Sequence, residues 1–150
     1  MSSYRSRPKG QFIQKADWQD LFLLTEEWRN NLEFYAKDID FLEHLIDTYF
    51  VKLLLSVNLD ELREIQQDFS SLNAECAILF QRIQLHLIHL KNLIEDPFKY
   101  DSYVFRSEHE QLEDEILRFK HHAKGLRRTV FDMVKDVLIN EKPKYLWKYN

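Results

Sequence analysis

The sequence contains few of the residues that interrupt helices. Its 150 residues include 2 Gly and 3 Pro, and none of these lies between residues 11 and 96. Proline breaks or kinks a helix because it removes a backbone donor and clashes with the preceding turn. After Pro97 the only further breaks are Gly125 and Pro143. This distribution predicts two long helical regions with one interruption near Pro97, and it leaves no Gly-rich loop that could hold a phosphate.

Cysteine and long apolar runs are equally scarce. The single cysteine, Cys76, excludes an internal disulfide framework and a Cys-based zinc site. The longest run without a charged residue, residues 83–90, is far shorter than the roughly 20 residues that span a membrane. The first ten residues lack the apolar segment of a secretory signal. We therefore expect a cytoplasmic protein that spans no membrane, with Cys76 as a reduced thiol in the core.

Charge is unevenly distributed along the chain. Residues 1–15 carry four basic residues and no acid, and residues 142–150 carry three lysines and no acid, so the rest of the chain holds all 25 acids against 14 bases. This is the ordinary charge of a soluble protein with basic ends. Alternatively, the ends dock on an acidic partner such as RNA, an anionic surface or a neighbouring copy, and Arg5, Arg7 and Lys9 would then form the N-terminal contact.

Apolar residues recur in alternating steps of three and four along three long segments. In the first segment these residues are Trp28, Leu32, Tyr35, Ile39, Leu42, Ile46, Tyr49 and Leu53. The same repeat covers residues 62–93 and 105–137, where it includes His86 and His109. A repeat of about 3.5 residues places side chains along one side of a helix and is typical of left-handed coiled-coil packing. Further apolar residues such as Phe34, Phe41 and Phe80 widen this face, so each helix should contact two neighbours.

We therefore predict an all-α fold, an antiparallel three-helix bundle with helices over residues 16–55, 59–95 and 107–141. Asn58 has the position of an N-cap, and Ser107 with Glu110 has the spacing of a capping box. Residues 11–24 form either a short fourth element at the N-terminal side or an extension of the first helix. The predicted organisation is a disordered basic tail over 1–10, one bundle domain over 11–141, and an aromatic and basic segment over 142–150 after a helix stop at Pro143.

The periodicity leaves the register of the last two helices open. The first two helices should pair antiparallel about residue 57. A tight turn at residues 97–98 would place His86 beside His109, whereas a loop ending at Ser107 would shift the last helix by a heptad and place His86 beside Ile116. Both registers satisfy the same apolar pattern because heptads repeat.

Two histidines, His86 and His109, occupy positions of the apolar repeat. His89 lies one turn from His86, and Glu113 lies one turn from His109, so in one register these four side chains would converge as metal ligands do inside helical bundles. The chain lacks, however, the Glu-x-x-His and His-x-x-x-His spacings of known bundle metal sites. The sequence favours buried, hydrogen-bonded histidines that fix helix register, and it predicts no bound metal or cofactor.

Two further segments carry charge or aromatic residues. Residues 120–128 are basic and follow the acidic residues 108–115 on the same helix, an order that complements the helix dipole. The alternative, a nucleic-acid surface, lacks interleaved aromatic residues. At the C-terminal end, Tyr145, Trp147 and Tyr149 alternate with lysines, so they either pack on the end of the bundle or anchor a partner.

Part of the pattern resembles a known group of sequences. The residues that carry the resemblance are Trp28, Leu32, Phe34, Tyr35, Leu42, His89, His109, Leu112, Phe119 and Arg127. They resemble small helical-bundle proteins of Bacteroidetes-type bacteria, which share a Trp-x3-Leu-x-Phe opening, a His-bearing second helix and a His-x2-Leu opening of the third. The resemblance covers residues 27–138. It implies a helical bundle and, because that group has no established activity, no catalytic residues.

No nucleophile elbow or Ser-His-Asp order is present, so we predict a protein without enzymatic activity. A narrow bundle with helices on the order of 50 Å long leaves large apolar residues uncovered. We therefore expect an interaction or scaffold protein that self-associates as a homo-oligomer through Phe34, Phe41 or Phe80. Its partner is then a second copy of the chain or another protein. The alternatives are a metal-binding bundle and a weak nucleic-acid binder.

Overall fold

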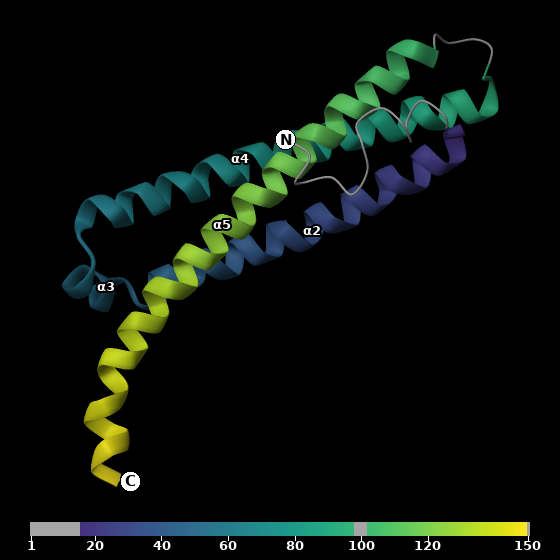
Figure 1. Ribbon diagram of the computed structural model, residues 1–150. Coiled ribbons are helices and arrows are strands. Elements are labelled where there is room, and N and C mark those ends of the chain that lie inside the picture. Colours follow the sequence, from purple (N-terminus) through teal and green to yellow (C-terminus); the bar gives the residue numbers. More distant parts are fainter. Residues whose placement is uncertain (1–15, 98–101, 150) are drawn as a thin grey trace.

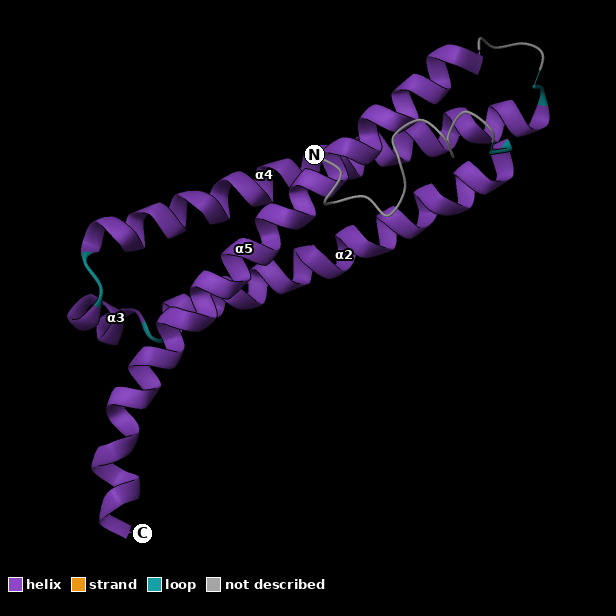
Figure 2. Ribbon diagram, viewed as in Figure 1, coloured by secondary structure: helices purple, strands orange, loops and turns teal. Residues whose placement is uncertain are grey.

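The computed structural model confirms the all-α fold. It describes residues 16–97 and 102–149, with side chains as far as residue 139. The helices are α2 (Trp18–Thr48), α3 (Phe50–Ser56), α4 (Leu59–Glu95) and α5 (Ser102–Tyr149). No strand occurs among the described residues (Figure 2). The predicted disordered tail over residues 1–10 lies outside the described part of the chain.

The N-termini of α2 and α4 are capped by side chains. Asp17 Oδ1 accepts a hydrogen bond of 2.8 Å from the backbone N–H of Asp20, and Asn58 Oδ1 accepts one of 2.9 Å from the N–H of Glu61. Such bonds satisfy donors that the first turn of a helix leaves unpaired. The role of Asn58 as an N-cap is thereby confirmed. Residues 18–24 belong to the first long helix and do not form a separate element.

The first predicted helix is interrupted near residue 49, which the apolar pattern did not indicate. Tyr49 has φ −102° and ψ 14° and separates α2 from α3. Immediately before it, Thr48 Oγ1 donates a hydrogen bond of 2.8 Å to the carbonyl of His44, a contact that bends helices. The change of direction allows α3 to contact α5. The prediction of one continuous helix over residues 16–55 is therefore wrong.

The last helix is longer at both ends than predicted. It begins at Ser102 and continues through Pro143 to Tyr149, so the prediction that Pro143 stops the helix is wrong. Proline removes one donor and crowds the carbonyl four residues earlier, which kinks a helix without necessarily ending it. The final part of α5 curves away from α2 and α4 and extends beyond α3 (Figure 1).

The three long helices pack side by side. α4 runs antiparallel to both α2 and α5, and all three contact one another (Figure 1). Asn73 Nδ2 donates a hydrogen bond of 2.6 Å to Glu43 Oε1, which confirms the predicted antiparallel pairing of the first two helices about residue 57. α3 crosses the end of this hairpin. The architecture is thus a three-helix bundle with a short helix at one end.

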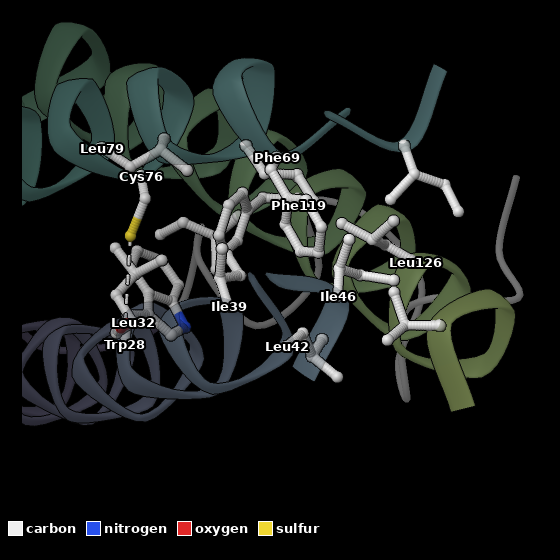
Figure 3. Close-up of a cluster of buried hydrophobic side chains, with 14 of the residues drawn as sticks. Trp28, Leu32, Ile39, Leu42, Ile46, Phe69, Cys76, Leu79, Phe119 and Leu126 are labelled. Carbon is white, nitrogen blue, oxygen red and sulfur yellow. Dashed lines mark hydrogen bonds between the residues drawn. The ribbon is translucent and has the colours of Figure 1, made fainter. Parts of the chain in front are cut away.

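The residues of the apolar repeat form the core, as predicted (Figure 3). Leu42, Leu79 and Ile116, one from each long helix, are all buried. Phe119 is fully buried and makes an edge-to-face contact with Tyr35, with ring centroids 6.1 Å apart. Gly125 lies inside α5, and it makes no close approach, because a Cβ added there would have no atom within 4 Å.

Candidate functional site

A cluster of polar side chains lies between α4 and α5. His86 Nε2 and His109 Nδ1 are 2.8 Å apart and share a hydrogen bond. This bond identifies the register of the two helices as the one that places His86 beside His109, and it excludes the register with Ile116. Both histidines are fully buried, and the ring of Trp28 from α2 lies 4.5 Å from the ring of His109.

The same cluster extends toward the surface through His89 and Glu108. Glu108 Oε1 lies 3.8 Å from His86 Nδ1 and 3.7 Å from His89 Nδ1. One ligand atom from each of these three residues lies within 4.8 Å of the other two, which makes the residues a candidate ligand set for a metal ion. The side chains of His89 and Glu108 remain 30% and 35% exposed. The cluster therefore has a buried inner part and an outer part that solvent reaches.

The structure brings together three of the four residues that were predicted as candidate metal ligands. It brings together His86, His89 and His109, whereas Glu113 is buried and does not belong to the group of converging ligand atoms. The carboxylate in that group is Glu108, which the sequence analysis did not single out. With His86 opposite His109 on antiparallel helices, residues just before His109 lie level with His89, so the correct register would have indicated Glu108.

Burial keeps the inner histidine neutral. The pKa of His86 is lowered from 6.5 to about 4, first by desolvation and then by the nearby His89 and Arg82. Arg82 is itself paired with Glu115 of α5. The Nδ1 atoms of His86 and His89 are both buried and have no hydrogen-bond partner within the described residues. A neutral imidazole with a free lone pair is the form that binds a metal ion.

The other predicted chemistry-bearing residues take structural positions. The pKa of Cys76 is raised to about 11 by burial and secondarily by Glu75, so this core thiol stays protonated at neutral pH. In the basic segment, Arg127 pairs with Asp38 of α2 and lies over the ring of Phe131. Arg5, Arg7 and Lys9 lie outside the described residues, as do the side chains of Tyr145, Trp147 and Tyr149.

A second candidate site is an apolar groove between α2 and α5. It has a volume of about 380 Å³ and is lined by Phe41, Leu45, Tyr49, Phe131, Val134, Lys135, Leu138 and Ile139. We refer to these residues as the α2–α5 groove. Phe41 is exposed, as is Phe34 two turns earlier, whereas Phe80 is partly buried against the core. The neighbouring α3 exposes Val51, Leu54 and Leu55.

No helix in the described ranges is long and apolar enough to cross a membrane. Comparison of the chain with family models, with curated proteins and with solved structures finds no match.

Proposed function

We propose that this protein is a non-enzymatic interaction protein that associates with a second copy of itself through the α2–α5 groove. The observation that carries the proposal is the composition of the groove. Among the described residues that line it, seven of eight are apolar or aromatic, and Lys135 is the one that carries a charge. Exposed apolar surface of this kind marks interaction sites on proteins that are otherwise covered by polar groups.

The surroundings of the groove favour a protein surface as its occupant. Aromatic residues such as Phe41 and Phe131, which line the groove, are favoured anchors at protein interfaces. The surface of α2 around Phe41 also carries three acidic residues, Asp40, Glu43 and Asp47, against one lysine, Lys37, and one histidine, His44. The groove is therefore an apolar strip with an acidic border, which resembles the core and rim of an interface.

Charge favours a second copy over an unrelated partner. Residues 142–150 carry Lys142, Lys144 and Lys148 and no acid, and their helix extends beyond the bundle (Figure 1). We infer that in a symmetric dimer the basic end of each α5 contacts the mainly acidic surface on α2 of the other copy. Most soluble homo-oligomers use a self-complementary interface of this symmetric type.

Sedimentation equilibrium over a range of concentrations tests the proposal. The wild-type protein should be a dimer at tens of micromolar, and the double variant Phe41→Glu/Ile139→Glu should be a monomer, because buried carboxylates without partners oppose association. The matched control is Ile78→Glu/Ile88→Glu on α4, where both residues are 56% exposed, and it should remain a dimer. A wild-type monomer at high micromolar concentration, or dissociation by the α4 variant alone, would contradict the proposal. Far-UV circular dichroism of each variant verifies that it is folded.

A further inference from the structure

The histidine cluster contains two polar residues, His89 and Glu108, that the hydrogen bond between the two helices does not need. The bond between His86 Nε2 and His109 Nδ1 is complete with two residues. His89 and Glu108 do not take part in it, yet both face the opposite side of the His86 ring. There the Nδ1 atoms of His86 and His89 are buried without a hydrogen-bond partner in the described part of the chain. Buried polar atoms are normally paired, so these two nitrogen atoms are available to a ligand from outside the described part of the chain.

The distances suit a small cation. Zinc binds histidine nitrogen at about 2.0–2.1 Å and carboxylate oxygen at about 2.0–2.2 Å, so two ligand atoms on a tetrahedral ion stand about 3.4 Å apart. Glu108 Oε1 lies 3.8 Å from His86 Nδ1 and 3.7 Å from His89 Nδ1. Movements of a few tenths of an ångström therefore bring the carboxylate to the ligand distance from each nitrogen. The ligand atoms of all three residues already lie within 4.8 Å of one another, so side-chain rotation about fixed helices closes the set around an ion. All three side chains belong to long helices, which hold their backbones in place.

The hydrogen bond to His109 fits the same role. If His86 binds a metal through Nδ1, its proton must reside on Nε2 and be donated to His109 Nδ1. Metal-binding histidines usually donate their second ring N–H in this way, which fixes the tautomer and the ring orientation. The Trp28 ring, 4.5 Å from the ring of His109, packs against this buried histidine. The buried inner part of the cluster thus serves as a support for the ligands.

The chemistry of the ligands selects the class of ion. Two imidazole nitrogens with one carboxylate oxygen suit Zn²⁺ and other divalent transition metals, whereas Ca²⁺ and Mg²⁺ prefer shells made of oxygen. Since His89 and Glu108 are partly exposed, an ion can reach the site from solvent, and water can complete its coordination. We propose that His86, His89 and Glu108 form a binding site for a divalent transition-metal ion, Zn²⁺ in the first place, at the α4–α5 interface.

Metal titration of the full-length, tag-free protein, first stripped with a chelator, tests this site. Calorimetry should give one Zn²⁺ per chain, and Ca²⁺ and Mg²⁺ should give no binding. His89→Ala and Glu108→Gln should each weaken Zn²⁺ binding at least about 100-fold, the upper end of what loss of an outer partner alone costs. The matched control is His44→Ala, which removes an exposed histidine next to acidic residues of α2 and should bind Zn²⁺ like the wild type.

Two further measurements separate a built site from unspecific binding. Because His89 and Glu108 are partly exposed, their metal-free variants should melt within a few degrees of the wild type, while Zn²⁺ should raise the Tm of the wild type and of His44→Ala only. The ¹⁵N chemical shifts of the His86 ring should show Zn²⁺ on Nδ1 and a proton on Nε2. The proposal would be overturned if the wild type bound no stoichiometric Zn²⁺, or if the His89 and Glu108 variants bound Zn²⁺ as tightly as the wild type. Loss of Zn²⁺ affinity in His44→Ala would overturn it as well.

Discussion

The packing of α5 against the other two long helices can be tested at Phe119. Its side chain is fully buried and contacts the ring of Tyr35 at 6.1 Å between centroids. Phe119 belongs to the same buried cluster as Ile39 of α2 and Phe69 of α4 (Figure 3). Phe119→Ala would therefore open a void that is bordered by all three helices. A helix that moved to fill this void would lose its present packing contacts with the other two.

The expected loss of stability follows from two contributions. Truncation of a buried Phe to Ala costs about 3–5 kcal/mol through lost burial and the cavity left behind. Within that loss, the edge-to-face contact with Tyr35 contributes about 0.5–1.5 kcal/mol. We therefore expect Phe119→Ala to lower the free energy of unfolding by about 4 kcal/mol, a large part of the roughly 5–15 kcal/mol that stabilises a typical domain.

Urea denaturation followed by far-UV circular dichroism measures this loss. With a slope of about 2 kcal/mol per molar urea, the midpoint should fall by about 2 M. The control is Leu85→Ala on α4, which removes an apolar side chain that is 53% exposed and should change stability by less than about 0.5 kcal/mol. If Phe119→Ala costs less than about 1 kcal/mol, or no more than Leu85→Ala, α5 does not pack against α2 and α4 as described.

Three other predictions concern the pair of buried histidines, the core cysteine and the glycine of α5. In chelator-treated protein, a double-mutant cycle of His86→Leu and His109→Leu should give a coupling energy of about 1 kcal/mol or more in urea unfolding, because the two rings share a buried hydrogen bond; additive losses would contradict the bond. The pKa of the Cys76 thiol is raised from 9.0 to about 11, so the folded protein holds this proton more tightly than the unfolded chain. Wild-type stability should therefore fall by about 2 kcal/mol more than that of Cys76→Ala between about pH 8 and 10.5, and equal pH dependence would refute it. Gly125→Ala should raise the Tm and add about 1 kcal/mol to the free energy of unfolding, because the added methyl meets no atom within 4 Å and Ala favours helix over Gly; a lower Tm would show that the site is not open.

The sequence predicted the core well because burial follows a local rule. Leu42, Leu79 and Ile116 were expected inside from their spacing alone, and the structure buries all three. The interruption at Tyr49 could not be predicted in the same way, because the apolar repeat continues through it without a change. The bend depends on the backbone at Tyr49 and on the hydrogen bond of Thr48 to His44, which apolar spacing does not encode.

The candidate metal site was only partly predictable for a related reason. His86 and His89 share one side of a helix in any register, but their neighbours on α5 depend on how far the two helices slide past each other. A shift of one heptad preserves every apolar contact and replaces His109 by Ile116 opposite His86. The length of the connection decides between these registers, and the sequence offered two lengths. Glu108 could be identified only after that choice was made.

The continuation of α5 beyond the bundle affects how the protein moves through a solvent. A helix of 48 residues at 1.5 Å per residue has a contour of about 70 Å, whereas a compact chain of 150 residues has a radius of gyration of about 15 Å and is about 40 Å across. The elongated particle experiences more friction than a sphere of equal mass. A monomer would therefore leave a gel-filtration column calibrated with globular standards early, at the position of a heavier protein.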